Sequence, residues 1–271
     1  MALSSPAPTS TALVTGASSG IGREIARGLA RRGHGVTLVA RRADRLEALA
    51  EELSGEHGVR AEAVPADLAD AQQRERVVRE VAERGLEVDV LVNNAGFGVY
   101  APFAAAGVER ELEQVELLVT AVVHLTGLVL PGMRERGRGT IINISSTSAF
   151  QALPGNGTYA AAKSFVLLHS EALAEEVRGQ GITVTAVCPG PVETEFQEVS
   201  EPLFTERVPK IVWASAERVA EDAIRAAERG RRTVIPGGLP VKAAFGMNRV
   251  SPPFVTLPIT RVLFGKELER G

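Results

Sequence analysis

The sequence is poor in thiol and metal-binding side chains, and this scarcity excludes several kinds of site. Cys188 is the single cysteine, so the chain forms no internal disulfide and no cysteine-based zinc site. The histidines show neither HxxxH nor HExxH spacing: they are His34, His57, His124 and His169. We therefore expect no metal site, and we interpret Cys188 as a small buried apolar residue rather than a nucleophile.

The chain also lacks an excess of positive charge. Its 271 residues carry a formal net charge of −3, with 45% apolar and 23% charged residues. This composition is typical of a globular protein. Because no positive balance is available to neutralise phosphates, we expect no nucleic-acid partner.

The sequence has little that indicates a leader or a membrane span. Residues 1–10 contain neither the basic nor the apolar region of a signal peptide, and we predict that they form a disordered tail. The longest apolar stretch without an acid or base, Leu117–Met133, contains a histidine, a proline and glycines. It predicts a buried helix rather than a membrane span. We expect a cytoplasmic protein.

Short apolar runs alternate with longer amphipathic segments between residues 11 and 235. The runs predict strands at Thr11–Thr15, Gly35–Ala40, Arg60–Val64, Val88–Val92, Thr140–Ser145, Ile182–Val187 and Arg232–Ile235. The amphipathic segments predict helices at Gly20–Arg32, Asp44–Leu53, Asp70–Arg84, Val108–Arg136, Thr158–Arg178 and Ser215–Arg229. This alternation predicts one α/β domain of three α/β/α layers, with a doubly wound parallel sheet of the Rossmann type over residues 11–235. Residues 236–271 are interrupted by prolines and are predicted to be an extension packed on this domain.

A glycine-rich turn, TGASSGIG, joins the first predicted strand to the first predicted helix. Its GxxxGxG spacing lets the backbone approach a pyrophosphate, which then meets backbone N–H groups and the positive end of the helix. Glycines also make plain structural turns, but the position between strand and helix favours nucleotide binding. The candidate residues are Gly16, Ser18, Ser19, Gly20, Ile21 and Gly22.

Two arginines follow the second predicted strand, where an NAD-binding protein usually has an acid. The strand ends at Ala40, and Arg41 and Arg42 come next. A carboxylate here bonds the ribose 2′-hydroxyl of NAD, whereas an arginine can bind a 2′-phosphate. The sequence therefore predicts NADP(H), with Arg41 as the main phosphate ligand and Arg42 as the weaker candidate. The alternative is that both only lie in solvent at a helix N-terminus, where the helix dipole disfavours cations.

Tyr159 and Lys163 are four positions apart in a predicted helix, so they share one face. A lysine ammonium beside a phenol favours the phenolate and lowers its pKa from about 10. The tyrosine can then act as a general acid or base near neutral pH. A YxxxK match alone is weak evidence, although the chain contains just two tyrosines.

In their order and spacing, these motifs and two others, NNAG at residues 93–96 and a PG segment from residue 189, resemble those of the short-chain dehydrogenases/reductases. The resemblance extends over residues 15–194 and implies catalysis by Ser146, Tyr159 and Lys163. Ser146 lies thirteen positions before Tyr159 and would hydrogen-bond the substrate oxygen. Ser145 is the alternative, and both serines could instead satisfy backbone groups at the end of the strand.

The same resemblance implies further contacts with the cofactor. Asp67 and Leu68 would flank the adenine, and Tyr159 and Lys163 would also touch the nucleotide. Residues of the NNAG and PG segments would lie against the cofactor, with Val192 and Thr194 facing the nicotinamide amide. The residues of these two segments are Asn94, Ala95, Gly96, Pro189, Gly190, Val192 and Thr194.

The sequence departs from the family at one position in the long helix before Thr140–Ser145. Many members have an asparagine there, whose backbone holds a water molecule that links the lysine to solvent. The matching residue here is Leu118. Either the Leu118 carbonyl holds the same water, because a backbone group needs no particular side chain, or the proton relay is impaired and turnover is slow.

The resemblance implies an oxidoreductase that transfers a hydride between NADP(H) and a carbonyl or alcohol carbon. A catalytically weak or inactive NADP(H)-binding sensor or scaffold on the same fold is the first alternative. Related chemistry, such as epimerisation or dehydration, is the second.

The sequence also bears on the substrate and the assembly. Aromatic residues in the variable segments predict an apolar substrate pocket, although they could equally be core or interface residues; they are Phe97, Tyr100, Phe103, Phe196, Phe204 and Trp213. Family members usually pair through two long helices, which correspond here to Leu117–Leu130 and Ala160–Leu173. We therefore expect a homodimer or homotetramer.

Overall fold

The computed structural model describes residues 3–195, 213–238, 241, 251, 254–258 and 260–261. Parallel strands form a seven-stranded sheet in the order β3-β2-β1-β4-β5-β6-β9. Its strands are β1 (Ser10–Thr15), β2 (Val36–Ala40), β3 (Ala61–Pro65), β4 (Glu87–Asn93), β5 (Gly139–Ile144), β6 (Ile182–Val187) and β9 (Thr233–Val234). This order confirms the predicted doubly wound sheet, with its topological switch point between β1 and β4.

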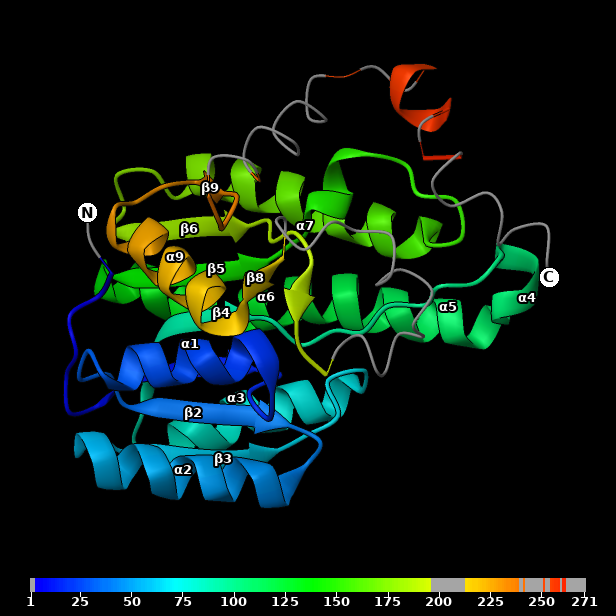
Figure 1. Ribbon diagram of the computed structural model, residues 1–271. Helices are drawn as coiled ribbons and strands as arrows, with labels where there is room; N and C mark the ends of the chain where they lie inside the picture. Colours follow the sequence, from blue (N-terminus) through cyan, green and yellow to red (C-terminus); the bar gives the residue numbers. More distant parts are fainter. Residues whose placement is uncertain are drawn as a thin grey trace.

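Helices cover both faces of the sheet (Figure 1). One layer holds α1 (Gly20–Ala30), α2 (Ala43–His57) and α9 (Ala216–Glu228), and the other holds α3 (Ala71–Glu83), α6 (Ala121–Arg136) and α7 (Gly157–Glu176). Each layer buries its own apolar cluster against the sheet, because successive side chains of a strand point to opposite faces. In β1, Ala12 and Val14 belong to the first cluster and Leu13 to the second. These buried strands are apolar along their length, as expected for a sheet covered on both faces.

Residues 108–136 form one long helical stretch with an irregular turn in the middle. It begins as α5 (Val108–Val115), passes through a π-helical turn (Glu116–Thr120) and continues as α6. By length and composition this stretch could cross a membrane, with a mean hydropathy of 1.7 over a window that is 33% buried. The inner face of α6 packs on β4 and β5, with Leu125 and Val129 in the core. The prediction of a buried helix therefore holds for the face that packs on the sheet.

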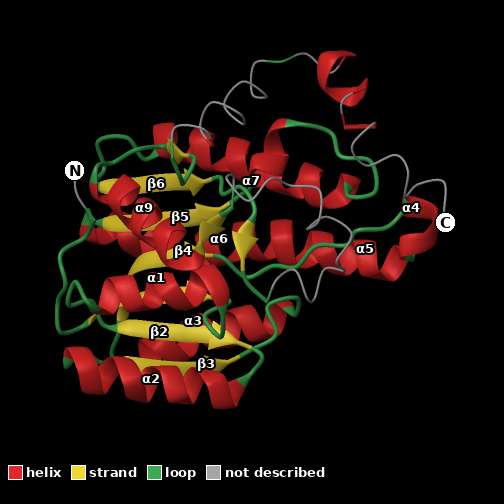
Figure 2. Cartoon of the chain, viewed as in Figure 1, coloured by secondary structure: helices red, strands yellow, loops and turns green. Residues whose placement is uncertain are grey.

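The structure adds short elements that the sequence pattern did not predict. They are α4 (Phe103–Ala106), a 3₁₀ turn (Thr147–Phe150) and a separate two-stranded sheet of β7 (Val192–Glu193) and β8 (Ala214–Ser215), with Trp213 directly before β8. Elements of two to four residues are too short to show a hydrophobic period. These elements lie among the loops at the carboxyl ends of the strands (Figure 2).

The two ends of the chain are described unequally. The first strand begins at Ser10, one residue earlier than expected, and in the segment before it the Ser4 backbone N–H donates to Thr140 Oγ1 at 3.4 Å. Most of the predicted extension 236–271 lies outside the described residues. Phe196 and Phe204, two of the predicted pocket aromatics, lie outside them as well.

Candidate active site

The glycine-rich turn lies at the carboxyl end of β1, at the switch point of the sheet. Gly16 and Gly20 have positive φ angles of 64° and 54°, which glycine adopts without strain. A Cβ on Gly22 would lie 2.4 Å from both Asn94 Nδ2 and the Gly16 carbonyl, and one on Gly20 would lie 3.1 Å from Thr194 Cγ2. Side chains at these glycine positions would collide with neighbouring atoms. The turn therefore exposes its backbone, which suits close approach of a phosphate.

The NNAG segment holds the end of β4 against the end of β1. The Asn94 and Ala95 backbone N–H groups donate to Thr15 Oγ1 at 2.8 and 3.0 Å, and Asn94 Nδ2 donates to the Thr15 carbonyl at 2.9 Å. Gly96 lies deeper, and a Cβ there would be 2.6 Å from Leu118 Cδ2 and 3.9 Å from Lys163 Nζ. The segment thus joins the glycine-rich turn to the buried centre of the site.

Arg42, rather than Arg41, is the arginine that the structure brings to the turn. The Arg42 guanidinium donates to Ser18 Oγ at 2.9 Å and to Ser19 Oγ at 3.0 Å, and it also pairs with Glu195. Arg41 is exposed and makes no hydrogen bond or ion pair with the described part of the chain. Arg42 occupies the N-cap position of α2, where its backbone is extended. Arg42 is thus the arginine that contacts the turn, and which of the two would bind a 2′-phosphate stays a prediction.

The predicted adenine-flanking residues lie in the loop after β3. Asp67 Oδ1 accepts from the Ala69 backbone N–H at 3.0 Å, and Leu68 is buried in the second core cluster. The Leu68 carbonyl accepts from Arg74 Nη1 at 2.7 Å. This contact holds the backbone of the loop after β3 against the buried side chain of Arg74.

Arg74 is a residue that the sequence analysis missed. Its side chain is 2% exposed, and besides Leu68 it donates to Glu116 Oε1 at 2.8 Å and to His124 Nδ1 at 3.0 Å. It therefore links the loop after β3 to the π-helical turn and to α6. A lone arginine in an amphipathic helix normally indicates a solvent-facing residue, so the sequence held no signal for this role.

Ser146, Tyr159 and Lys163 are brought together between β5 and α7. Tyr159 is 7% exposed and Lys163 5% exposed, and Ser146 hydrogen-bonds the Tyr159 hydroxyl. Ser146 Oγ also accepts from the Ser148 backbone N–H at 3.0 Å. Ser145, the alternative serine, instead donates to the Lys163 backbone carbonyl at 2.7 Å. The structure therefore favours Ser146 as the serine that faces Tyr159.

Burial shifts the pKa values of both ionisable groups of this site towards their neutral forms. Burial raises the pKa of Tyr159 far above its ordinary value; nearby Tyr100 adds to the rise, and the bond from Ser146 opposes it. Burial lowers the pKa of Lys163 to about 8. The prediction of a lowered phenol pKa is wrong for this structure. Lys163 Nζ donates to the Ile144 carbonyl at 2.8 Å and lies 5.6 Å from the Tyr159 ring centroid, and burial is the largest influence on the phenol.

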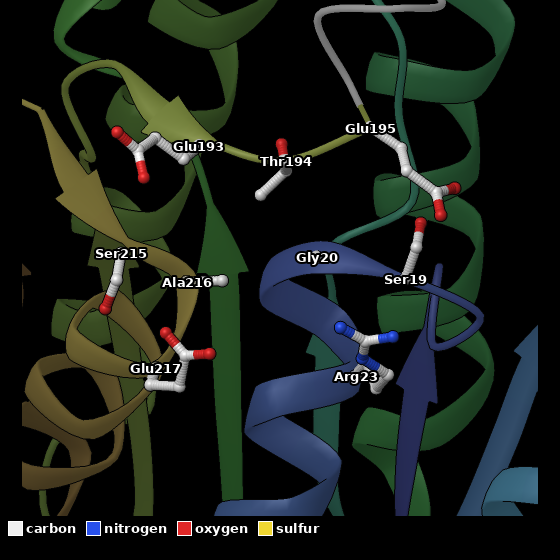
Figure 3. Close-up of a pocket in the computed structure, with 9 residues that line it drawn as sticks. All are labelled: Ser19, Gly20, Arg23, Glu193, Thr194, Glu195, Ser215, Ala216 and Glu217. Carbon is white, nitrogen blue, oxygen red and sulfur yellow. The ribbon is translucent and has the colours of Figure 1, made fainter.

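The PG segment runs from the neighbourhood of Ser146 to the glycine-rich turn. The Pro189 carbonyl accepts from the Thr147 backbone N–H at 2.9 Å, Gly190 follows, and Val192 pairs with Ala214. Thr194 lies directly over Gly20. A pocket of about 220 Å³ opens beside it, between the N-terminal ends of α1 and α9 (Figure 3). It is lined by Ser19, Gly20, Arg23, Glu193, Thr194, Glu195, Ser215, Ala216 and Glu217.

Leu118 lies in the π-helical turn, against the centre of the site. Its side chain is 1% exposed and packs with Tyr159 and Ala162. The turn replaces the ordinary helical bonding, since the Ala121 N–H donates to the Glu116 carbonyl five residues earlier. Such turns shift the register of backbone carbonyls and occur often at functional sites.

The predicted pocket aromatics do not form one group among the described residues. Phe97 is buried, with the Arg110 guanidinium 4.0 Å from its ring centroid, whereas Phe103 is 73% exposed on α4. Tyr100 is close enough to Tyr159 to influence its pKa, and Trp213 is half-buried beside β8. Of these aromatics, Tyr100 is the one that interacts with Tyr159 in the described part of the chain.

A glycine-rich turn at the switch point of a doubly wound sheet, with a buried tyrosine and lysine beside it, defines a nucleotide-binding protein of the Rossmann type. Comparison with known families makes this more specific. The short chain dehydrogenase family model matches residues 10–202. The chain belongs to this family.

Relatives with known structures or names agree with this assignment. A short-chain dehydrogenase from Sphingobium yanoikuyae in complex with NADPH superimposes with a TM-score of 0.78 and 33% identity, covering 88% of this chain and 92% of that one. Sulfoacetaldehyde reductase 2 of Chromohalobacter salexigens is 36% identical over 220 residues, covering 77% of this chain and 84% of the relative. The very-long-chain 3-oxoacyl-CoA reductase of Anas platyrhynchos is 35% identical over 203 residues, which are 73% of this chain but 65% of that longer protein.

Proposed function

We propose that the protein is an NADP(H)-dependent oxidoreductase that transfers a hydride between the nicotinamide and a carbonyl or alcohol carbon. The arrangement of Ser146, Tyr159 and Lys163 beside the glycine-rich turn carries this proposal. The residues present fit a nucleotide, since the turn excludes any Cβ and Arg42 with Ser18 offers donors for a phosphate. The NADPH-bound relative supports the same cofactor. When bound, the reduced cofactor supplies the hydride.

The protein's own residues then manage the proton and the substrate oxygen. The Tyr159 hydroxyl stays protonated at neutral pH because burial raises its pKa, so it can donate a proton to the oxygen of a carbonyl substrate. Ser146 Oγ accepts from the Ser148 N–H, and its O–H, which bonds the Tyr159 hydroxyl in this structure, can turn to donate to that oxygen when a substrate binds. Lys163 holds a proton close to Tyr159, with a pKa of about 8 that allows it to exchange near neutral pH.

Leu118 bears on how the proton is replaced. We propose that its backbone carbonyl holds the relay water, because the π-helical turn changes the bonding of carbonyls at this point of the helix. The second candidate function, a catalytically weak NADP(H)-binding sensor or scaffold, is favoured by the same residue. The Leu118 side chain packs against Tyr159, and it offers no polar group to the proton relay where many family members have an asparagine.

The substrate is proposed to be an apolar ketone, aldehyde or secondary alcohol. Buried Phe97 and half-buried Tyr100, which is close enough to Tyr159 to influence its pKa, support this choice. The names of the relatives do not decide it, because one reductase is named for a very-long-chain acyl substrate and another for a sulfonated aldehyde.

We further propose a homodimer or homotetramer in the cytoplasm, with residues 11–235 as the catalytic domain. The exposed apolar side chains of α5 and α7 support pairing, and the packing of α6 on the sheet supports a non-membrane role for the long helical stretch.

The test begins with calorimetric titrations of the purified protein with NADPH and with NADH. NADPH oxidation is then followed on a panel of carbonyl compounds with the wild type and with Tyr159→Phe. We expect tighter binding of NADPH, turnover in the wild type, and turnover lost by at least about a hundredfold in Tyr159→Phe with NADPH affinity retained. Retained affinity is the control for folding.

Other outcomes discriminate between the two candidate functions. Tight NADPH binding with no turnover on the panel, in either direction, favours the sensor or scaffold. Failure to bind either nucleotide overturns both.

A further inference from the structure

Glu195 places a negative charge on the arginine that would bind the cofactor's 2′-phosphate. It follows Thr194, where the chain crosses the glycine-rich turn, and its carboxylate reaches the side of the turn that carries Ser19 (Figure 3). One Glu195 oxygen accepts from Arg42 Nη1 at 2.9 Å. Both oxygens accept from Arg45 Nη1, at 2.7 and 2.9 Å.

The partners of Arg42 differ in charge. Its Nε and Nη2 atoms donate to the neutral hydroxyls of Ser18 and Ser19, whereas Nη1 donates to Glu195. Within the described ranges, Glu195 is the one anion on this guanidinium. The group that would attract a phosphate is therefore already paired with a carboxylate of the same chain, which it shares with Arg45.

We propose that Glu195 is a cofactor-specificity residue that competes with the 2′-phosphate for Arg42 and so reduces the preference for NADP(H) over NAD(H). The inference rests on the proposed nucleotide binding. A carboxylate and a phosphate on one guanidinium repel each other, so NADPH must displace Glu195 or bind beside it. NADH has no such phosphate and leaves the pair with Arg42 intact.

The surroundings make this competition modest and reversible. The side chains of Arg42 and Glu195 are 41% and 37% exposed, and ion pairs at such sites are weak. Arg45 holds both Glu195 oxygens, so the carboxylate keeps a partner when it leaves Arg42. Hydrogen bonds from Arg42 and Arg45 also keep the pKa of Glu195 below its usual value, so it is charged across the neutral range.

The test compares Glu195→Gln with Glu193→Gln by calorimetric titration of NADPH and of NADH. Glu193 lines the same pocket two residues earlier, and it makes no ion pair among the residues that the structure covers, so its variant controls for the loss of one negative charge. We expect Glu195→Gln to tighten NADPH binding about three- to tenfold and to change NADH binding by less than about twofold. Glu193→Gln should leave the ratio of the two affinities at its wild-type value.

Unchanged or weaker NADPH binding in Glu195→Gln overturns the inference, because Glu195 would then be inert or would orient Arg42. An equal gain in Glu193→Gln overturns it as well, because the effect would be general electrostatics. Neither result affects the proposed oxidoreductase, provided that the wild type binds NADPH. If the wild type binds neither nucleotide, the proposed function fails and this inference fails with it.

Discussion

Lys163 is a cationic side chain that folding places among apolar groups. It is 5% exposed, and its ammonium has the Ile144 carbonyl as a hydrogen-bond acceptor. Burial disfavours the charged form, which is why its pKa falls from 10.5 to about 8. The site thus keeps near Tyr159 a group that gains and loses a proton close to physiological pH.

The lowered pKa of Lys163 makes the stability of the nucleotide-free protein depend on pH. Between pH 8 and 10.5 the unfolded chain binds the Lys163 proton more than the folded chain does, so this residue makes stability rise with pH in that window. The whole rise amounts to about 3 kcal/mol. Urea unfolding across this window should show it in the wild type and lose it in Lys163→Met. Equal pH slopes in the two proteins would show that Lys163 titrates normally.

The two arginines after β2 should differ in their effect on cofactor choice. Because Arg42 lies on the hydroxyls of Ser18 and Ser19 while Arg41 is exposed, Arg42→Gln should weaken NADPH binding about tenfold or more and NADH binding much less. Arg41→Gln should weaken NADPH binding less than Arg42→Gln does. Calorimetric titration measures both. A larger loss in Arg41→Gln would restore the order predicted from the sequence.

At the scale of elements, the π-helical turn and the NNAG segment are fitted to each other. A Cβ on Gly96 would lie 2.6 Å from Leu118 Cδ2, and Leu118 is held in place by Tyr159 and Ala162. The glycine of this motif therefore makes room for a side chain from another element, besides any contact with the nucleotide.

A double-mutant cycle tests this fit. Gly96→Ala should destabilise the protein by about 1–3 kcal/mol through overpacking, and Leu118→Ala by about 2–5 kcal/mol through the cavity that it leaves. The double variant should be more stable than the sum of the two losses predicts, because the methyl group added at residue 96 occupies part of the cavity left by Leu118→Ala. The measurement is the free energy of unfolding in urea. Strict additivity would mean that the two side chains do not meet.

The sequence predicted the elements that have a local residue pattern. It did not predict which way individual side chains point. The apolar run of β6 and the glycines after β1 are such patterns, and both lie where they were expected. Whether Arg41 or Arg42 turns towards the phosphate turn depends on side-chain direction at one helix N-cap, which no period reveals. The same holds for Ser145 and Ser146, adjacent residues that point to different partners.

Arg74 shows a second limit of sequence reasoning. Its three partners come from the loop after β3, the π-helical turn and α6, and two of them lie more than forty residues away in the sequence. The pair β7 and β8 is similar, since its two strands are separated by about twenty residues of sequence. Contacts of this kind follow from the topology and not from neighbouring residues.

At the scale of the whole molecule, apolar side chains are exposed on the outer faces of the long helices. They are Val108, Leu112, Val115 and Val123 on the stretch from α5 to α6, and Phe165 and Leu168 on α7. On their inner faces the same helices carry Leu118 and Tyr159, which pack together in the proposed reaction centre. A partner subunit on this face would therefore press directly on the helices that hold the site.

Pairing through this face should be sensitive to a charge at Leu168, which is 65% exposed. Leu168→Glu should shift the wild-type oligomer towards the monomer, because the carboxylate would be buried without a partner. Leu257→Glu is the matched control, since Leu257 is an exposed leucine outside both helices. Sedimentation velocity distinguishes the species. A monomeric wild type, or an equal shift in both variants, would reject this interface.

Trp213 has a consequence of another kind. It is the single tryptophan of the chain, and it directly precedes β8, which is paired with the strand leading to Thr194 and Glu195. When tryptophan alone is excited, the emission therefore comes from one known place beside the proposed nucleotide pocket. Reduced nicotinamide absorbs the light that tryptophan emits, so occupancy of the pocket should quench this emission in proportion to binding. The protein thus contains its own optical reporter, and the binding steps described above can be followed in real time without a label.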